Sequence, residues 1–590
     1  MIRYADVKPG MVPRWEHTYP GRFEHEIRDL LHFVGDSLRV DGDLLAKGIL
    51  RLTFMCPLPD GRKCALQAVF PDTYPFIRPQ VSLVATQDSF PERHVSPIDG
   101  TLCLLGRDSG LWPAKWTLAE LLNRQLANAL GGSGSEDPQG EPMEVWWNNV
   151  APAAEGYVEG SYMLVDSSWD LGSALIGTAK ISFALERTQG GIIWRGAVDE
   201  VKAADGTVLA KREFALPSDI EARKTSRTFP WRRVERLAPP TQAMSRDRAF
   251  WDDVVFNKDN SGPALDGAVS MSITVQSTEI AHERRGDTWL FAALYGPAQS
   301  FRRPKPGQKP HKQTLLIVPT YRAGIEDVGG RVPSVGVLRN KTVAVFGLGA
   351  IGASLAIELA RNGCRKIIVL DHDFVEPGNS IRWPLGSSAW GRRKVSVLKE
   401  FVEREYPATV VQAVTHHVGA AAVQEGTGDL DVLPGIIAEA DLVVDATASS
   451  GVSRLLADLC QRAAKMMVSA YATASLKGGV VAVYHPASGC PTCREFAYQS
   501  GHIQKPPGSG ESEALRQPPG CAELTFTGAS FDLQELSLAA VRTVVDVMTN
   551  PSSYQGSMIN TLSLHDGTRS APPSWTADLL PPMRECGCKP

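Results

Sequence analysis

The chain has 590 residues, of which 43% are hydrophobic and 21% are charged, and its formal net charge is −4. This length exceeds what one hydrophobic core organises, so we expect about three domains. The small net charge gives no electrostatic case for binding nucleic acid or an anionic membrane, which argues against both classes of partner.

The N-terminal residues contain no apolar run of signal-peptide length, and no stretch approaches the roughly 18 apolar residues of a membrane-spanning helix. We therefore expect a cytoplasmic protein. Its ten cysteines are then expected to be reduced, catalytic or metal-binding rather than paired in disulfides.

Two segments rich in Gly, Pro, Ser or charge divide the chain. Residues 131–142 read GGSGSEDPQGEP, which is typical of a flexible linker, and residues 301–313 read FRRPKPGQKPHKQ, which favours an extended connection. We expect a multidomain protein with an N-terminal domain at 1–130, a β-rich middle domain at 143–313 and a C-terminal domain at 314–590.

The N-terminal segment predicts an α+β domain. A helical pattern, FEHEIRDLLHFV, is followed by three strand-like runs, GILRLTFMCPL, CALQAVF and QVSLVAT, and then by an amphipathic TLAELLNRQLANAL. Between the last strand and this helix lies HVSPIDGTLCLLG, which contains Cys103. Reactive cysteines need partial exposure and structural ones lie in apolar runs, so Cys103 is either a nucleophile or a thiol at a strand end.

The middle segment consists mostly of alternating strand patterns, such as KISFALE, GGIIWRGAV and SMSITVQ, and contains no cluster of residues that indicates chemistry. The C-terminal segment is different. Its run KTVAVFGLGAIGASLAIELARNGCRKIIVLDHD predicts strand, glycine turn, helix and strand, the order of a Rossmann-like βαβ unit.

Gly347, Gly349 and Gly352 form G-x-G-x-x-G directly after the strand TVAVF, and Asp371 follows the second strand. Such glycines allow backbone to approach phosphates at a helix N-terminus, and the carboxylate can accept hydrogen bonds from ribose. The alternative is a βαβ core that binds nothing. The pattern predicts a nucleotide site without separating a dinucleotide dehydrogenase from an enzyme that uses ATP.

The residues after Asp371 favour ATP. They include Asp373, Asn379, Arg382 and Lys394. Two cations and an amide beyond the ribose position suit a triphosphate attacked by a carboxylate, because fixed positive charge stabilises the developing negative charge. Hydride transfer has no such need.

These motifs, GLGAIG, DHDFVEPGNSIRW, GRRKV and DLVVDAT, resemble the ThiF/MoeB adenylating enzymes, the group that includes ubiquitin-activating enzymes, over roughly residues 320–588. The resemblance implies ATP-dependent adenylation of a C-terminal glycine carboxylate on a small protein. It implies that Asp371 contacts ribose, Asn379 and Arg382 contact phosphates, and Lys394 contacts the transition state. It also suggests pairing of adenylating domains in a homodimer.

Two positions depart from the family pattern. Trp383 stands where the family has Gln, and Ala448 stands where it commonly has a magnesium-binding Asp. Mg²⁺ is then held by Asp445 or by the nucleotide alone, or the adenylation site is degenerate. Arg331 is a candidate arginine finger toward a partner subunit, on position alone.

Five of the other cysteines fall into two groups. Cys490 and Cys493, in GCPTC, and Cys586 and Cys588, in ECGC, suit a structural zinc ion, which is common in the family; the alternative is four unligated thiols. Cys521 lies in PPGCAELTF after a loop rich in Pro, Gly and Ser, as either the acyl-accepting thiol or an incidental loop thiol. Four cysteines in apolar runs are expected in cores: Cys56, Cys64, Cys364 and Cys460.

The N-terminal segment in turn resembles the ubiquitin-conjugating enzymes. FPDTYPFIRPQV (70–81) matches their Phe-Pro-x-x-Tyr-Pro element, and HVSPIDGTLCLL matches their His-Pro-Asn…Gly-x-Ile-Cys loop, with Trp112 and Trp116 following. This resemblance implies that Cys103 is a nucleophile. Ser96 replaces the usual Asn, and His94 is either an acid–base group or a loop-packing residue.

An activating domain fused behind a conjugating domain resembles the bacterial fusions of CBASS antiphage operons. The resemblance implies adenylation of a modifier with a C-terminal glycine, thioester formation on Cys521, transfer to Cys103 and attack by a target lysine to give an isopeptide bond. The modifier would be a cyclic-nucleotide synthase or a ubiquitin-like protein. A non-catalytic scaffold with decayed sites and an NAD-dependent oxidoreductase are the alternatives.

Overall fold

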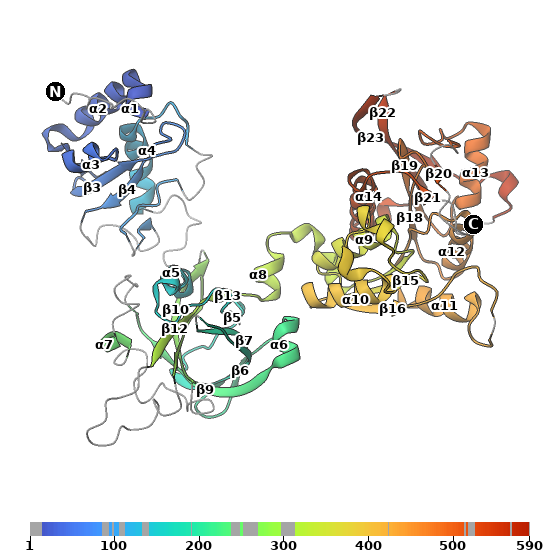
Figure 1. The fold of residues 1–590 in the computed structure, drawn as a ribbon, viewed down its shortest axis with the longest axis horizontal. Coiled ribbons are helices and arrows are strands. Elements are labelled where there is room, and N and C mark those ends of the chain that lie inside the picture. Colours follow the sequence, from blue (N-terminus) through green and yellow to red (C-terminus); the bar gives the residue numbers. More distant parts are fainter. Residues whose placement is uncertain are drawn as a thin grey trace. The chain divides into compact units, whose positions relative to one another are not determined.

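The structure is a computed structural model, and the chain forms two compact units (Figure 1). The first unit comprises Met1–Glu213 and Arg223–Val328, and the second comprises Phe214–Ala222 and Gly329–Pro590. The structure describes these residues: 15–84, 94–96, 99–105, 112–131, 141–189, 191–237, 248–251, 269–281, 283–296, 313–422, 424–511, 515–516, 525–566 and 569–588.

The N-terminal part of the first unit is an antiparallel meander of four strands with a helix before it and a helix after it. Buried and less buried residues alternate along the two long strands, as expected for a sheet with one face on the core. This order confirms the predicted helix, meander and helix. The elements are α2 (Pro20–Val34), β1 (Arg39–Val40), β2 (Leu50–Pro57), β3 (Lys63–Phe70), β4 (Gln80–Leu83) and α4 (Leu118–Gly131).

A buried carboxylate joins the two helices. Glu26 of α2 is 2% exposed and accepts hydrogen bonds from the backbone N–H of Leu118, at 2.9 Å, and from the side chains of Arg22 and Tyr74. Burial raises the pKa of Glu26 to about 7, although the Leu118 and Arg22 hydrogen bonds act in the opposite direction. The stability of this junction therefore depends on pH.

The middle of the chain forms a nine-stranded sheet in the order β12-β11-β10-β9-β6-β7-β5-β13, with β8 beside β7. KISFALE and SMSITVQ lie in β6 and β10, and the IIWRGAV part of GGIIWRGAV lies in β7, so these strand predictions are confirmed. The last two strands follow residue 313, so the sheet includes residues that the sequence grouped with the C-terminal domain. The strands are β5 (Tyr162–Val165), β6 (Ile176–Arg187), β7 (Ile192–Ala203), β8 (Val208–Lys211), β9 (Thr225–Val234), β10 (Val269–Ala281), β11 (Arg284–Tyr295), β12 (Thr314–Val318) and β13 (Thr320–Arg322).

A short segment between β8 and β9 belongs to the second unit rather than to this sheet. Phe214 is 8% exposed, and Ile220, which lies in α6 (Ser218–Arg223), is 0% exposed. The Ser218 hydroxyl donates to the backbone carbonyl of Arg404 at 3.3 Å. The C-terminal unit is therefore completed by residues from the middle of the sequence.

The second unit is an α/β fold on an eight-stranded sheet ordered β16-β15-β14-β17-β18-β19-β22-β23. The first five strands are parallel and the remaining three are antiparallel, so the predicted Rossmann-like βαβ unit is confirmed. The strands are β14 (Thr342–Phe346), β15 (Lys366–Leu370), β16 (Val410–Val414), β17 (Leu442–Asp445), β18 (Met467–Ala472), β19 (Gly478–Tyr484), β22 (Ser557–Asp566) and β23 (Arg569–Leu580).

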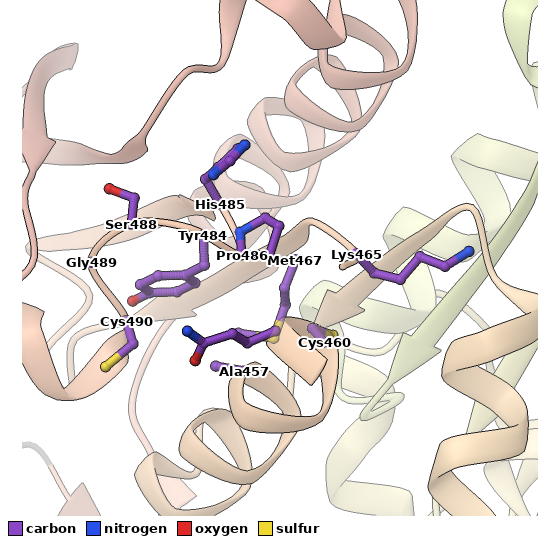
Figure 2. A pocket seen from close by; sticks show the side chains of 11 residues that line it. Ala457, Cys460, Lys465, Met467, Tyr484, His485, Pro486, Ser488, Gly489 and Cys490 are labelled. Carbon is purple, nitrogen blue, oxygen red and sulfur yellow. The ribbon is translucent and has the colours of Figure 1, made fainter. Parts of the chain in front are cut away.

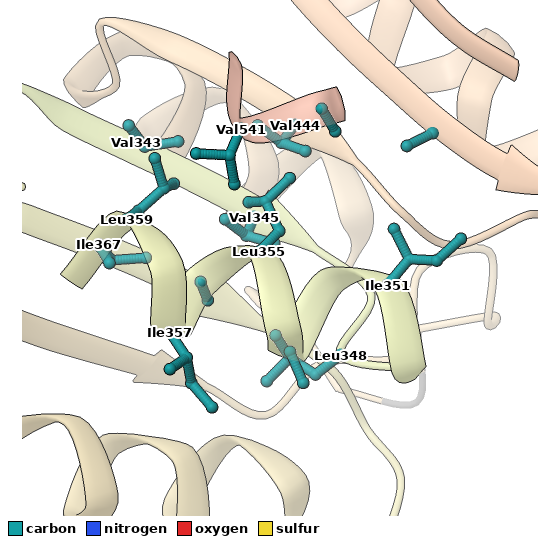
Figure 3. Close-up of a cluster of buried hydrophobic side chains, with 14 of the residues drawn as sticks. Val343, Val345, Leu348, Ile351, Leu355, Ile357, Leu359, Ile367, Val444 and Val541 are labelled. Carbon is teal, nitrogen blue, oxygen red and sulfur yellow. The ribbon is translucent and has the colours of Figure 1, made fainter. Parts of the chain in front are cut away.

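Helices cover both faces of this sheet. Alternate residues of β14 belong to different cores: Val343 and Val345 pack with α9, α10 and α14, as Figure 3 shows for part of this core, whereas Phe346 packs with α11 and α12. This two-sided burial explains why the strand is a continuous apolar run. The helices are α9 (Ala350–Arg361), α10 (Lys394–Glu405), α11 (Asp429–Glu439), α12 (Ser450–Arg462), α13 (Pro491–Ser500) and α14 (Ser530–Thr549). Among the helices that the structure describes, none has the length and apolar character needed to span a membrane.

Candidate active site

The glycine turn lies between β14 and α9, where backbone atoms crowd two of its three glycines. Gly347 has φ +84°, and a Cβ there would lie 2.8 Å from the Ala446 carbonyl oxygen. A Cβ on Gly352 would lie 1.9 Å from the Gly347 carbonyl oxygen, whereas a Cβ on Gly349 would meet no atom within 4 Å. Gly347 and Gly352 are thus required by packing, and Gly349 leaves open space at the N-terminus of α9, where an anion is stabilised.

Asp371 follows β15 and ties the glycine turn to the next loop. One carboxylate oxygen accepts from the Leu348 N–H at 2.6 Å and the other accepts from the Asp373 N–H at 2.7 Å. The residue is 9% exposed. The carboxylate is therefore fixed beside the turn at the position where a Rossmann-like fold binds ribose, and each oxygen has a further lone pair for a hydroxyl.

Lys394 begins α10 and faces the same loop. Its ammonium lies 2.8 Å from a carboxylate oxygen of Asp373, and its backbone N–H donates to the Asp373 carbonyl at 3.0 Å. Burial opposes ionisation of Asp373, but the hydrogen bond and charge of Lys394 lower its pKa below the usual value. The His372 ring stacks on His417 with 3.8 Å between ring centroids, and His372 is also 3.3 Å from Asp373.

Asn379 lies in a 3-10 helix, Pro377–Ile381, and Arg382 follows this helix directly. The Asn379 side-chain oxygen accepts from the Glu376 N–H at 3.0 Å, which caps this helix. The Arg382 guanidinium donates to the Phe526 carbonyl at 2.8 Å, and its central carbon lies 4.5 Å from the centroid of the Phe526 ring. Burial lowers the pKa of Arg382, as expected for a partly desolvated cation.

Trp383, which stands where the resembled family has Gln, contacts the glycine turn directly. Its indole N–H donates to the Leu348 carbonyl at 2.8 Å, and its side chain is 5% exposed. Leu348 thus has both backbone polar groups held, by Asp371 through its N–H and by Trp383 through its carbonyl. The sequence marked Trp383 only as a departure and gave no sign of this contact.

Asp445 ends β17 and is 1% exposed. Its carboxylate accepts hydrogen bonds from the N–H and hydroxyl of Thr447 and from the hydroxyls of Ser453 and Ser469. These donors hold the carboxylate inside the fold, so it does not suit a Mg²⁺ ligand in this arrangement. Ala448 offers no ligand and has φ +56°, which is uncommon outside glycine.

Four cysteine sulfurs converge from two parts of the second unit. Cys490 and Cys493 lie at the start of α13, Cys586 and Cys588 lie near the C-terminus, and all four sulfurs lie within 4.8 Å of one another. The pairs Cys490–Cys586 and Cys493–Cys588 are 3.4 and 3.1 Å apart, and the Met583 N–H donates to the Cys493 sulfur. Tetrahedral zinc with Zn–S bonds of about 2.3 Å needs sulfurs about 3.8 Å apart, so this donor set fits zinc.

A small cavity lies beside this cluster, between Cys490, Tyr484 and Cys460 (Figure 2). Its volume is ≈ 10 Å³. A space of this size holds about one water molecule, so we do not regard it as a substrate site.

Cys103 is exposed on the loop between β4 and α4. Backbone hydrogen bonds hold the loop: the Cys103 N–H donates to the His94 carbonyl at 2.9 Å, and Ser96 and Thr101 pair at 2.8 Å. Gly100 has φ +68°, and a Cβ there would lie 3.2 Å from the Leu83 carbonyl oxygen. The exposure of Cys103 meets the requirement for a reactive thiol, and the glycine allows the turn that presents it.

Ser96 contributes to the turn before Cys103. Although burial acts to raise the pKa of Asp99, hydrogen bonds from Ser96 and Thr101 lower it. Ser96 therefore holds a carboxylate within the loop. Trp112 also supports the domain nearby, because its indole N–H donates to the Pro75 carbonyl at 2.8 Å.

The four cysteines expected in cores are buried, which confirms that prediction. Burial raises the pKa of Cys56, Cys364 and Cys460 to about 12 and also raises that of Cys64. These thiols are therefore poor nucleophiles at neutral pH.

Cys521 lies outside the described residues. The strand residues on either side of it are described: Arg516 of β20 (Leu515–Arg516) pairs with Thr525 of β21 (Thr525–Phe526). Arg331 is exposed at the start of the second unit. The structure thus brings Asp371, Asp373, Lys394 and the glycine turn together. It also places Phe526, which no sequence motif identified, against Arg382.

A cavity of ≈ 320 Å³ lies beside the middle sheet and is lined by polar and charged residues together with Pro142, Val145 and Ile280. The Arg322 guanidinium donates to the Glu144 carboxylate, and the Asp327 carboxylate accepts from the N–H groups of Ser167 and Gly324. These contacts stabilise the walls of the cavity, and we assign no chemistry to it.

Comparisons with known proteins agree with the division of the chain into two units. The ThiF family model matches residues 328–550. The uncharacterized protein y4qC of Sinorhizobium fredii is 44% identical over 599 residues, which cover 100% of both chains, and y4oA of the same organism is 28% identical over 617 residues, 97% of each chain. The ATP-dependent ubiquitin transferase-like protein Cap2 of Enterobacter hormaechei is 25% identical over 176 residues, 30% of this chain and 28% of Cap2.

Proposed function

Because the chain belongs to one family with y4qC and its C-terminal half is a ThiF-family domain, we propose that it adenylates the C-terminal glycine of a modifier protein with ATP and conjugates that modifier to a target. One observation carries the first step. Asp371, Lys394 and the glycine turn meet at the carboxyl edge of β14 and β15, where a Rossmann-like sheet binds nucleotides.

In the proposed first step, a carboxylate oxygen of the modifier attacks the α-phosphorus of ATP. The bond from this phosphorus to the oxygen that bridges to the β-phosphate breaks, and pyrophosphate leaves. Asp371 binds ribose, Asn379 and Arg382 bind phosphates, and Lys394 stabilises the negative charge that develops. Lys394 reaches the nucleotide by exchanging its contact with Asp373, which lies 2.8 Å away.

Mg²⁺ would accompany ATP and neutralise charge on its phosphates. The residues around the β17 end do not fit a protein-held ion, because the Asp445 carboxylate is held by four hydrogen bonds and the Ala448 side chain has no ligand atom. We propose that the nucleotide itself holds Mg²⁺.

We assign the acyl-accepting thiol to Cys521. Its thiolate attacks the carbonyl carbon of the acyl-adenylate, AMP leaves with the electron pair of the C–O bond, and a thioester remains. The pairing of Arg516 with Thr525 supports this assignment, since it anchors both sides of the segment in the adenylating unit.

The conjugating step is assigned to Cys103. Its thiolate displaces the Cys521 thiolate from the acyl carbon. A neutral lysine amine of the target then attacks this carbon, the Cys103 thiolate leaves with the electron pair of the C–S bond, and the amine nitrogen loses a proton to solvent, giving an isopeptide bond. Ser96 and His94 support the loop in this proposal: Ser96 by holding Asp99, and His94 through its carbonyl contact with the Cys103 N–H.

Zinc is proposed as a structural ion held by Cys490, Cys493, Cys586 and Cys588, where it would join the C-terminus to α13. We further propose a homodimer through the adenylating domain, and a modifier that is either a cyclic-nucleotide synthase or a ubiquitin-like protein. The similarity to Cap2, described as an ATP-dependent ubiquitin transferase-like protein, supports conjugation. We propose that this conjugation serves antiphage defence.

Incubating the protein with ATP, Mg²⁺ and candidate modifiers tests this function. We expect ATP–pyrophosphate exchange that depends on the modifier's terminal glycine, and an adduct on a non-reducing gel that a thiol reagent removes. The Cys521→Ala variant should retain exchange and lose its own adduct. A modifier lacking its terminal glycine is the control.

If no candidate modifier gives either ATP–pyrophosphate exchange or an adduct, the result would favour a non-catalytic scaffold. An NADH titration tests the oxidoreductase alternative separately, because saturable binding of NADH without binding of ATP would contradict adenylation.

A further inference from the structure

We infer that Phe526 is a positioning residue that orients the Arg382 guanidinium toward the phosphates of ATP. This inference rests on the proposed adenylation and names a residue that no motif assigns. The two contacts that carry it come from the same residue: the Phe526 carbonyl accepts from Nη1 of Arg382 at 2.8 Å, and the Phe526 ring lies 4.5 Å from the guanidinium carbon.

The chemistry of the two contacts is complementary. An aromatic ring attracts a cation to its face, and the N–H groups of a guanidinium point outward in its own plane. A ring that covers the face leaves the edge of the guanidinium, where its N–H groups lie, accessible to polar acceptors. The Phe526 carbonyl accepts from Nη1 and so limits the rotation of the group.

The Arg382 guanidinium is partly buried, which strengthens its interaction with an anion once its orientation is fixed. The pKa of Arg382 is lowered by desolvation, which means that the cation has lost part of its water before any anion binds. A desolvated cation held in place stabilises phosphate charge without the cost of ordering a flexible side chain. Positioning by Phe526 is therefore expected to favour ligands that carry phosphate.

The place of Phe526 in the chain adds to its importance. It ends β21, the strand that pairs with β20 across the segment containing Cys521, and α14 begins at Ser530. The backbone that returns from the proposed thiol segment thus supplies the contact that orients the proposed phosphate ligand.

Binding of ATP and of adenosine to the full chain separates this role from a structural one. Phe526→Ala removes the ring and keeps the carbonyl, Phe526→Tyr keeps both, and Phe531→Ala is the matched control, because Phe531 is 73% exposed on α14. Calorimetry with ATP·Mg²⁺ and competition with adenosine give the two affinities. We expect Phe526→Ala to weaken ATP about 3- to 30-fold and to leave adenosine unchanged.

Among the three variants, only Phe526→Ala should differ from the wild type in its affinity for ATP. Phe526→Tyr and Phe531→Ala should bind ATP as the wild type does. Unchanged ATP affinity in Phe526→Ala would overturn the inference alone, and so would an equal loss of ATP and adenosine, which would assign the ring to the fold. A wild-type chain that binds no ATP would overturn the proposed adenylation together with this inference.

Discussion

The glycine turn after β14 and the Cys103 loop are both irregular backbone, yet the fold holds them differently. In the glycine turn, both polar groups of Leu348 are fixed by side chains from other elements, and two glycines have no room for a Cβ. In the Cys103 loop, the backbone is held by hydrogen bonds within the loop and to the neighbouring strand β4, and the thiol is exposed.

The difference follows from what each region is proposed to contact. A phosphate is stabilised by donors whose positions are fixed before it arrives, so crowding around the turn is useful. A thiol that exchanges an acyl group with another thiol must be reached by a bulky partner, so exposure is useful. Substitutions should therefore have different consequences in the two regions.

The largest expected effect comes from removing the thiols. Cys103→Ser should abolish the isopeptide product, lowering its rate at least about 100-fold, because a serine hydroxyl is not ionised at neutral pH. Gel analysis with and without thiol should show the Cys521 adduct still forming. Loss of ATP–pyrophosphate exchange in Cys103→Ser would contradict the separation of the two regions.

Lys394→Ala should lower ATP–pyrophosphate exchange about 100- to 1,000-fold, the size of effect seen when a fixed charge-stabilising donor is removed from an active site. Its expected effect on a thioester already formed on Cys103 is small. Lys399→Ala is the control, since Lys399 also lies in α10 but pairs with Glu403. Equal activity of the two variants would contradict the role of Lys394.

Removing zinc should destabilise the C-terminal unit. Cys586→Ser, or a strong chelator, should release bound zinc and lower the Tm of this unit by at least about 5 °C, because metal binding contributes to folding free energy. Metal analysis and calorimetry measure both effects, with Cys103→Ser as the control. Wild-type protein that contains no metal after purification with added zinc would contradict the site.

The N-terminal domain should lose stability as pH rises. The folded pKa of Glu26 is raised to about 7 from an ordinary 4.5, so its contribution is complete below pH 4.5 and is lost as pH rises through 7. This corresponds to at most about 3 kcal/mol. Urea unfolding at pH 5 and pH 8 should show this loss in the wild type and a smaller one in Glu26→Gln. If the free energy of unfolding depends on pH identically in the wild type and Glu26→Gln, Glu26 is not the group responsible.

The smallest effect is expected from Trp383→Phe, which keeps an aromatic ring and removes the hydrogen bond to the Leu348 carbonyl. One such bond contributes about 1 kcal/mol, so ATP binding should weaken roughly 5-fold. Calorimetry measures this change. An unchanged affinity would mean that the other contacts of Leu348 suffice to hold the glycine turn.

Much of the fold could be predicted because local patterns and tertiary structure agree. The continuous apolar run of β14, the glycines after it and the helix that follows all require the same βαβ geometry. The alternation in β2 and β3 likewise matches a sheet with one buried face. The convergence of Cys490 and Cys586 could be proposed because close pairs of thiols are typical of metal ligands.

Other features had no local signal. Phe526 and Arg382 are 144 residues apart, and neither neighbourhood indicates a contact between them. Thr447, a donor to Asp445, lies within the DATAS motif, but the other two donors, Ser453 of α12 and Ser469 of β18, lie outside it, so the full set of hydrogen bonds could not be inferred from the motif. Such contacts depend on how elements pack, which periodicity does not specify.

The segment Phe214–Ala222 limits how this protein can be divided by genetic recombination or by a protease. A C-terminal fragment cut at residue 329 lacks a piece of its own unit, including Ile220, and would leave apolar surface in water. A cut at residue 313 has the same defect. A fragment of the C-terminal unit that folds completely must therefore include the middle segment, so the order of the regions along the chain is constrained by folding.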